Sequence, residues 1–378
     1  MKKILYLTTI PWVWIKQRPQ FLAEYLATDF DVVYCYRRPT TIKKKDLIRN
    51  ASDLKSSNLS FRSFRLIPFN AIPLLNKMRL DWINRLLLKC QIPAPSNYDI
   101  IWVTSSQLFN LLPDDIKNSP NIIYDCMDDL LEFPGVSGSP IVEKLKSNEN
   151  YLLKKAKAVI CSADYLKNKI VNRSGITPNK VTVVNNAVEL PPKNLHSKLP
   201  TNIADIIKDM HAMKLNLVYI GTIDKWFDFD SILYALDKIE DMNISLFGPL
   251  RGTLPQHNRI HYYGTIPRDY IFDIMDAANV LIMPFKLNEL IRSVNPVKLY
   301  EYIYACKPVI ATKYGETLKF RDYVLLYDDR EELVSIIEDL KEGRYNLVIN
   351  ENLDYIKKNT WAERYKQIKQ VLLNNFKI

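Results

Sequence analysis

Glycine is scarce in this chain. It contributes 9 of 378 residues, about 2.4% against a usual share of about 7%. Neither a GxGxxG nor a GxxxxGK[ST] sequence occurs anywhere. These absences argue against a nicotinamide-binding Rossmann site and against a P-loop, because both depend on glycines where the backbone approaches phosphate.

Cysteine and histidine are also sparse. The five cysteines stand far apart without a CxxC pair, and the four histidines form no HExxH motif. An odd number of separated cysteines fits a reducing compartment better than a disulfide framework. The spacings therefore indicate neither disulfide staples nor a metal site.

Long hydrophobic runs are missing as well. The start MKKILYLTTIPWVWIKQRP superficially resembles a signal peptide, but Pro11 interrupts its apolar run and no small-residue cleavage site follows. No stretch of about 20 apolar residues is available for a transmembrane helix. We predict a cytoplasmic protein in which residues 1–9 form a first buried strand.

Positive charge is concentrated in one region. Thirteen bases and three acids lie between Arg37 and Lys89, and their difference equals the net charge of +10. We interpret this basic 37–89 region, which also carries Trp82 and several phenylalanines and leucines, as a surface for an anionic membrane or a phosphate-bearing substrate. A solvated basic face over ordinary core residues is the alternative. No nucleic-acid-binding signature accompanies the charge, so we expect no nucleic acid partner.

Short apolar runs alternate with longer helical patterns, as in βα units around a parallel sheet. The predicted strands are 4–8, 31–35, 100–103, 121–124, 158–161, 181–184, 215–220, 244–247, 260–263, 280–283, 309–311 and 324–327. We expect an N-terminal acceptor-binding domain (1–190), an Asn- and Pro-rich linker (191–212), a C-terminal donor-binding domain (213–352) and a terminal helix (353–378).

One segment, RSVNPVKLYEYIYACKPVIAT, combines a helix start with charged residues. Asn295 as N-cap and Pro296 at the first helical position predict that a helix begins there. Its free backbone N–H groups favour a phosphate, and Lys298 adds a full charge in the first turn. Glu301 shares the helical face of Lys298 and can accept hydrogen bonds from two ribose hydroxyls. The alternative is an ordinary Lys–Glu surface pair.

Further candidates follow predicted strands. Gly221, Thr222 and Lys225 follow a strand of the second half, where ligands sit in open α/β sheets; a turn glycine and a solvated lysine are the alternative. The loop 11–19 contains Trp12, Trp14, Gln17 and Arg18, which we interpret as acceptor-binding rather than core residues.

Three carboxylates end another strand of the first half. Asp125, Asp128 and Asp129 lie in YDCMDD, and we expect Asp128 or Asp129 to act as a base on an acceptor hydroxyl or to stabilise positive charge. Crowding of carboxylates raises the pKa of at least one of them. Helix capping by Asp128 or Asp129 is the alternative.

The stretch NPVKLYEYIYACKPVIAT, preceded by YIGTIDKWFDFDSILYAL and DAANVLIMPF, resembles the donor domain of GT-B glycosyltransferases, especially bacterial family-4-like enzymes of surface polysaccharide synthesis. WIKQRPQFLAEYLA and YDCMDDLLEF resemble the teichuronic-acid type of that group. The resemblance implies that Lys298 binds the donor diphosphate and Glu301 the ribose. Ser293 stands where the family often has a first glutamate, so Arg292 or Asn295 is expected to supply part of the sugar contact. Cys306 replaces a glycine that ends the helix.

The expected fold is therefore α/β of the GT-B type: two Rossmann-like, doubly wound domains facing a central cleft, with the C-terminal helix docking back. The expected activity is transfer of a sugar from a nucleotide-diphosphate sugar, a UDP-sugar being favoured, to a lipid-linked or polysaccharide acceptor of bacterial surface glycan synthesis. Lys298, Arg292 and the helix start would stabilise the leaving diphosphate without a metal or other cofactor. The resemblance favours retention of configuration.

Location and two rival functions complete the expectations. The basic 37–89 region would hold the enzyme at the inner face of the cell membrane. One rival is a nucleotide-sugar 2-epimerase on the same fold, which would need no acceptor surface. The other is a non-catalytic scaffold that binds nucleotide sugar or glycan. The presence of Ser293 leaves this hypothesis open, whereas the presence of Lys298 and Glu301 argues against it.

Overall fold

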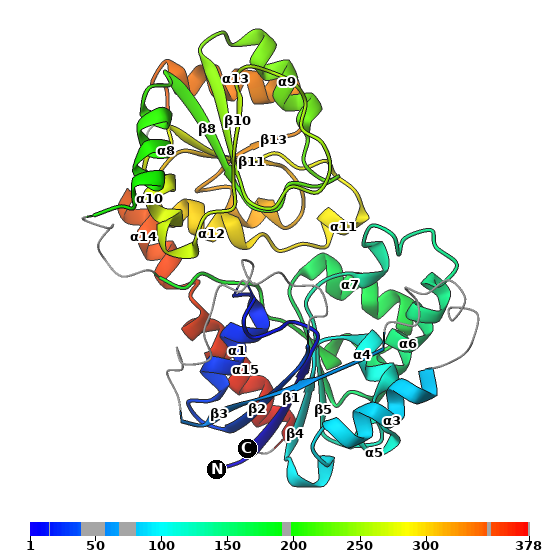
Figure 1. Cartoon of the computed structure of the whole chain (residues 1–378). Coiled ribbons are helices and arrows are strands. Elements are labelled where there is room, and N and C mark those ends of the chain that lie inside the picture. The colour runs from blue at the N-terminus through cyan, green and yellow to red at the C-terminus, as the bar shows by residue number, and fades with distance from the viewer. Residues whose placement is uncertain (15, 39–56, 68–80, 191–197, 346–348, 377–378) are drawn as a thin grey trace. The chain divides into compact units, whose positions relative to one another are not determined.

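The computed structural model describes residues 1–14, 16–38, 57–67, 81–190, 198–345 and 349–376. The chain divides into two compact units. Unit 1 comprises Met1–Asn185 and Trp361–Ile378, and unit 2 comprises Asn186–Thr360. Figure 1 shows the helices and strands of both units.

Unit 1 is built around a parallel sheet in the order β3-β2-β1-β4-β5-β6-β7. Its strands are β1 (Lys3–Thr8), β2 (Asp31–Arg37), β3 (Leu59–Phe64), β4 (Ile100–Val103), β5 (Ile122–Cys126), β6 (Ala158–Cys161) and β7 (Val181–Val183). Every residue of β4, β5 and β6 is buried. Continuous apolar runs are typical of strands covered on both faces.

Helices connect these strands. They are α1 (Arg18–Leu26), α3 (Asp81–Gln91), α4 (Ser106–Leu111), α5 (Asp114–Lys117), α6 (Val142–Lys155), α7 (Asp164–Ser174) and α15 (Trp361–Phe376). Local chemistry sets their ends. The Ser105 hydroxyl accepts from the Leu108 N–H at the start of α4, and Gly175 ends α7 with a φ of 69°.

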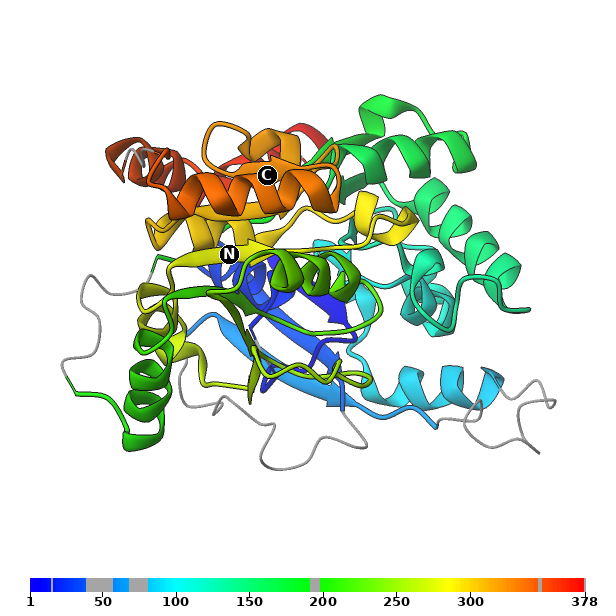
Figure 2. The same cartoon turned by 90° about the horizontal axis from the view of Figure 1, so that it is seen from above.

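Unit 2 repeats the arrangement with the parallel order β10-β9-β8-β11-β12-β13. The strands are β8 (Leu215–Ile220), β9 (Met242–Phe247), β10 (Ile260–Gly264), β11 (Val280–Met283), β12 (Val309–Thr312) and β13 (Leu325–Tyr327). The helices are α8 (Thr201–His211), α9 (Phe229–Lys238), α10 (Ile271–Asp276), α11 (Glu289–Arg292), α12 (Val297–Tyr304), α13 (Arg330–Lys341) and α14 (Ile349–Lys357). Figures 1 and 2 show α9 and α13 side by side.

Both sheets have the doubly wound order in which the chain reverses direction across the sheet between two central strands. These strands are β1 and β4 in unit 1 and β8 and β11 in unit 2. Ligands of such sheets bind beyond the carboxyl ends of the strands at this reversal. The predicted pair of doubly wound, Rossmann-like folds is therefore confirmed.

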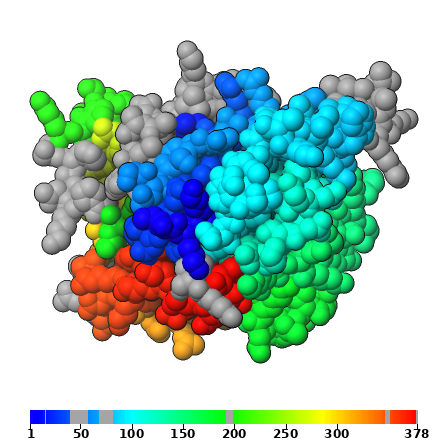
Figure 3. Space-filling model, turned by 90° about the horizontal axis from the view of Figure 1, so that it is seen from below, coloured from blue at the N-terminus to red at the C-terminus, as the bar shows by residue number. Residues whose placement is uncertain are grey.

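The C-terminal helix packs on unit 1, as expected. The ring of Trp361 stacks on Phe21 with the ring centroids 4.9 Å apart, and the Tyr365 hydroxyl donates to Asp29 at 2.7 Å. Figure 3 shows α15, in red, against the dark blue start of the chain. Among the described residues, no helix combines the length and apolar character needed to cross a bilayer.

Three elements differ from the sequence expectation. The edge strand β3 was not predicted, because LSFRSF lies within the basic region and has only its two end residues buried. The predicted linker 191–212 contains a helix, α8. The predicted terminal helix is two helices: α14 belongs to unit 2 and α15 to unit 1, with the break at Thr360, which bridges to Val188.

Candidate functional site

The predicted donor residues Gly221 and Lys298 lie together at the end of β8. A methyl group at Gly221 would collide with Lys298 Cε and lie 2.6 Å from its Nζ, so the lysine tip lies directly on the glycine backbone. The helix α12 is held in register because the Ile220 N–H donates to the Tyr302 hydroxyl at 2.9 Å. The Lys298 amino group lies over the Tyr219 ring, 5.7 Å from its centroid. This places a cation at the sheet reversal of unit 2.

A second glycine shapes the same strand ends. Gly248 follows β9 with a φ of 128°, and a Cβ at this position would collide with the Gly221 carbonyl oxygen. The Gly221 N–H donates to the Phe247 carbonyl at 2.7 Å. Only residues without a side chain allow the backbones after β8 and β9 to approach this closely. Two of the chain's glycines, Gly221 and Gly248, thus let the backbones after β8 and β9 approach each other beside Lys298.

Burial affects the charge on Lys298. It lowers the pKa of the Lys298 amino group from its ordinary value, while the negative charge of Glu301 acts in the opposite direction. No carboxylate lies within ion-pair distance of Lys298 in the part of the chain that is described. A partly buried cation without a carboxylate partner is stabilised by a bound anion.

Glu301 is buried and pairs with Arg268 instead of Lys298. The Arg268 guanidinium lies 3.0 Å from Glu301 Oε1, and the glutamate side chain is 10% exposed. Arg268 comes from the short turn that follows β10. The ordinary Lys–Glu surface pair that the sequence left open is therefore not formed.

The start of α12 differs from the prediction. The helix begins at Val297 with Pro296 as its N-cap residue, and no side chain caps it. Asn295 is buried and does not cap the helix, because its side chain accepts from the Asn186 N–H at 2.9 Å and donates to Glu316 at 3.1 Å. Asn295 therefore anchors the segment before the helix.

The other donor candidates lie near this site with different exposure. Arg292 ends the short helix α11 and is exposed, while the buried Ser293 hydroxyl donates to the Glu289 carbonyl at 3.0 Å. The Thr222 carbonyl accepts from the Tyr219 hydroxyl at 2.9 Å, and Lys225 is exposed. The backbone at Thr222 is thus fixed, whereas Arg292 and Lys225 remain accessible to a ligand.

At the end of α12, Cys306 adopts a backbone conformation typical of the glycine that it replaces. Cys306 has a φ of 55°, in the left-handed region that favours glycine. Its N–H donates to the Ile303 carbonyl at 3.1 Å. The helix therefore ends in a left-handed residue even without glycine.

Two of the four predicted acceptor residues are engaged inside unit 1. Trp12 is buried, with ring centroids 4.6 Å from Phe61 and 5.1 Å from Tyr34. Arg18 is buried too: its Nε lies 3.0 Å from Asp125, and it also donates to the Val184 carbonyl at 2.8 Å. These contacts correct the interpretation of Trp12 and Arg18 as ligand-facing residues.

The remaining two acceptor candidates are more accessible. Trp14 is half-buried, with its carbonyl accepting from Gln20 at 3.4 Å, and Gln17 is exposed. An acceptor-binding role stays a prediction for Trp14 and Gln17.

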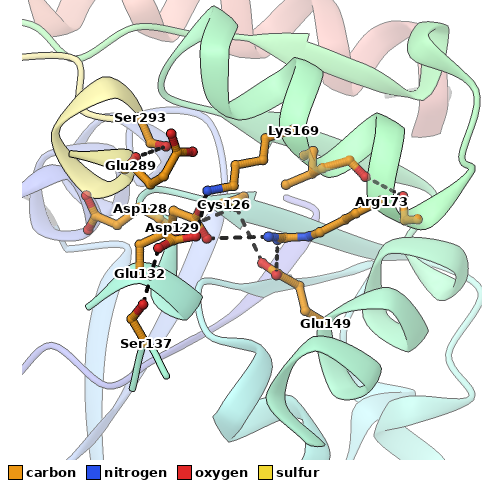
Figure 4. Close-up of polar contacts among 12 residues, drawn as sticks. Cys126, Asp128, Asp129, Glu132, Ser137, Glu149, Lys169, Arg173, Glu289 and Ser293 are labelled. Carbon is orange, nitrogen blue, oxygen red and sulfur yellow. Dashed lines mark hydrogen bonds and ion pairs between the residues drawn. The ribbon is translucent and has the colours of Figure 1, made fainter. Parts of the chain in front are cut away.

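The carboxylates after β5 separate into two kinds. Asp129 is fully buried and pairs with Lys169 at 2.9 Å and Arg173 at 3.4 Å, both from α7. Arg173 also pairs with Glu149 of α6, which accepts from the Tyr124 hydroxyl. Figure 4 shows this network and Asp128 turned away from it. Asp129 is therefore committed to the structure of unit 1.

Asp128 is exposed, yet its acidity is strongly changed. Displacement of water by surrounding protein raises the pKa of Asp128 to about 6; the positive charge of Arg18 opposes this, and the charges of Asp125 and Asp129 add to it. A carboxylate with a pKa near neutrality is suited to act as a general base. Of the two candidate carboxylates, Asp129 is held in the interior and Asp128 is accessible, and the role of Asp128 as a base stays a prediction.

Several residues of these sites escaped the sequence analysis. They are Arg268, Asn186, Lys169 and Arg173. Arg268 and Asn186 carry no local signal, because their partners Glu301 and Asn295 lie far away in sequence. Within the described ranges, no group of three or more His, Cys, Asp or Glu side chains is arranged to hold a metal ion.

Comparison with known sequences finds a similarity to a curated bacterial protein. The chain is 26% identical over 230 residues to TuaH of Bacillus subtilis (strain 168), which carries the provisional name of a teichuronic acid biosynthesis glycosyltransferase. The match covers 57% of this chain and 56% of that protein, so it spans little more than half of either. No family model matches the chain.

Comparison with solved structures covers nearly the whole chain. Anabaena Alr3699/HepE in complex with UDP and glucose has a TM-score of 0.68 and 16% identity, covering 98% of this chain and 99% of that one. An E. coli structure described as trehalose-6-phosphate bound with UDP-2-fluoro glucose has a TM-score of 0.70 and 12% identity, with 98% and 99% covered. The chain shares this fold, the two-unit Rossmann-like arrangement of GT-B glycosyltransferases.

Proposed function

We propose that this protein is a glycosyltransferase that uses a UDP-sugar as donor. The observation that carries the proposal is the position of Lys298 on the Gly221 backbone with Glu301 one helical turn further on. The relative named as a glycosyltransferase and the HepE structures with UDP and UDP-glucose support the reaction and the nucleotide.

The donor would lie along the start of α12. Its diphosphate would meet the Lys298 ammonium and the backbone N–H groups of the helix start, and its ribose would meet Glu301. As the bond from the sugar to the diphosphate breaks, negative charge grows on the leaving phosphate. Lys298, with the accessible Arg292, would stabilise that charge, so we propose that the reaction needs no divalent metal and no other cofactor.

Asp128 would serve the acceptor or the sugar. Ionised above its raised pKa, it can take the proton of an acceptor hydroxyl or stabilise an oxocarbenium-like sugar. We propose a glycan or lipid-diphosphate-linked acceptor of bacterial surface glycan synthesis, because the relative is named for teichuronic acid biosynthesis. Retention of configuration is proposed from the family resemblance.

The test is thermal stabilisation by UDP-, GDP-, ADP- and dTDP-sugars of the wild type and of Glu301→Ala. A ligand at 100 times its dissociation constant stabilises a protein by about 2.7 kcal/mol. We expect a shift with one UDP-sugar that Glu301→Ala loses. Exposed Glu331→Ala in the same unit is the matched control. No shift with any donor would refute the donor site.

Turnover separates the proposal from its rivals. Release of UDP that depends on an added acceptor supports a transferase. Conversion of the donor sugar without an acceptor would instead support a 2-epimerase, and binding without any turnover would support a scaffold.

Membrane association is a further part of the proposal. The exposed face of α3 carries Trp82 and Leu86, 61% and 57% exposed, one helical turn apart, together with the exposed Arg85 and Lys89. Aromatic and aliphatic side chains next to bases suit an anionic lipid surface. The segments 39–56 and 68–80 of the basic region lie outside the described residues.

Vesicle sedimentation tests this contact. We expect the wild type to bind phosphatidylglycerol vesicles in a salt-dependent way and phosphatidylcholine vesicles weakly. Trp82→Ser with Leu86→Ser should reduce binding about a hundredfold or more, since each buried apolar side chain contributes about 1.5–3 kcal/mol. Tyr151→Ser, 43% exposed on α6, is the control. Unchanged binding by the double variant would exclude α3 as the contact.

A further inference from the structure

Arg268 determines what Glu301 can contact. In an isolated helix, a lysine and a glutamate three residues apart attract each other. In this structure the Arg268 guanidinium lies 3.0 Å from Glu301, and the Lys298 amino group lies over Gly221 and Tyr219. The expected pair within α12 is thus replaced by a pair between α12 and the turn after β10.

The Arg268–Glu301 pair is partly shielded from water, which strengthens its effect on the position of the Glu301 carboxylate. The Glu301 side chain is 10% exposed and that of Arg268 is 33% exposed, so water screens their attraction only in part. A hydrogen bond between two ionised groups is short and directional. It holds the Glu301 carboxylate in one orientation and keeps it away from Lys298.

We propose that Arg268 is a positioning residue that makes the site selective for ribonucleoside diphosphates over their 2′-deoxy analogues. With Oε1 on Arg268, the carboxylate is fixed for hydrogen bonds from the two ribose hydroxyls. At the same time Lys298 stays available to the diphosphate. The inference rests on the proposed donor site and adds the group that sets its selectivity for the sugar of the nucleotide.

Selectivity follows from the energetics of a fixed carboxylate. A site built to bond a hydroxyl discriminates strongly against a ligand that lacks it, because a buried polar group then loses its partner. A carboxylate free to rotate would pair with Lys298 whether or not the 2′-hydroxyl is present. Loss of Arg268 should therefore weaken diphosphate binding and reduce the selectivity for ribose together.

The experiment measures the dissociation constants of UDP and 2′-deoxy-UDP by calorimetry on the full chain. We expect the wild type to prefer UDP by about tenfold or more. Arg268→Ala should weaken UDP binding about tenfold and bring the two constants close together, and Arg268→Lys should restore part of the preference. Arg321→Ala, whose side chain is 74% exposed in the same unit, should match the wild type.

A double variant separates positioning from a general structural role. Because Arg268 acts through Glu301, Arg268→Ala combined with Glu301→Gln should be no worse for UDP than Glu301→Gln alone. Additive losses would overturn the inference, and so would an Arg268→Ala protein that keeps the wild-type preference. If Arg268→Ala does not fold, the dissociation constants of UDP and 2′-deoxy-UDP are compared for Arg268→Lys and Arg268→Gln instead.

The same measurement distinguishes failure of the proposed donor site from failure of the proposed role of Arg268. If the wild type binds neither nucleotide, the donor site itself is refuted. If it binds UDP and 2′-deoxy-UDP equally, the donor site stands and the role of Arg268 is refuted.

Discussion

At the scale of single residues, neighbouring carboxylates have different roles because their partners differ. Asp129 is buried against two cations, whereas Asp128 is exposed and its ionisation is opposed by its surroundings. A carboxylate whose pKa is raised by folding lowers the stability of the protein once it ionises. Asp128 therefore does not favour folding at neutral pH, and a chemical role is the hypothesis to test.

Asp128→Asn should abolish activity without destabilising the fold. A missing general base costs about 10²–10⁴-fold in rate. In the wild type, kcat/KM should rise with pH up to about 6, the pKa of Asp128, because the base must be ionised. The raised pKa makes stability fall as pH rises from the unfolded value near 3.8 to about 6, so the variant at pH 7 should be as stable as the wild type or more stable. UDP release and urea unfolding measure the two effects.

Asp129→Asn is the matched control. It leaves Lys169 and Arg173 without their shared carboxylate, and breaking such a buried pair costs about 3–5 kcal/mol. Its urea midpoint should fall markedly. If Asp129→Asn were stable but inactive while Asp128→Asn kept activity, the assignment of the two residues would be reversed.

At the scale of elements, sequence patterns predicted what depends on neighbours along the chain. The spacing of Lys298 and Glu301 follows from helix periodicity, and the strands of both sheets follow from short apolar runs. The pairs Arg268–Glu301 and Arg18–Asp125 join residues 33 and 107 positions apart. A local pattern holds no information on such pairs, which is why Arg18 and Trp12 were assigned to the ligand although they belong to the interior.

Two glycines at the strand ends should respond differently to alanine. In Gly221→Ala the new methyl group meets the flexible tip of Lys298, which can move away; UDP affinity should fall about tenfold, as expected for loss of one charge-assisted contact. In Gly248→Ala the methyl group meets the backbone of Gly221, which cannot move freely. Stability should fall more for Gly248→Ala than for Gly221→Ala, as measured by thermal unfolding with and without UDP.

Gly252→Ala isolates the backbone contribution. Gly252 has a φ of 128°, the same as Gly248, but nothing lies within 4 Å of a Cβ there. The decrease in the free energy of unfolding of Gly252→Ala therefore measures only the strain of this backbone conformation, about 1–3 kcal/mol. Equal losses for Gly248→Ala and Gly252→Ala would contradict the proposed close approach of the two strand ends.

At the scale of the whole molecule, the chain leaves unit 1 at Asn185 and returns to it at Trp361. Unit 1 is therefore completed by a helix, α15, that follows unit 2 in the chain. Trp361 is 1% exposed and stacks on Phe21, so the returning helix contributes a large aromatic side chain to the packing of unit 1. The stability of unit 1 should depend on α15, whereas the donor residues of unit 2 should not.

Trp361→Ala tests this dependence. Replacing a buried tryptophan by alanine costs about 3–5 kcal/mol, and the cost should fall on unit 1 alone. In scanning calorimetry, UDP identifies the transition of unit 2 because ligand binding raises it. We expect Trp361→Ala to lower the other transition and to leave the UDP-induced shift and the UDP dissociation constant unchanged. Trp82→Ala, at an exposed tryptophan, should change neither transition. A Trp361→Ala protein whose UDP-responsive transition falls instead would show that α15 stabilises unit 2.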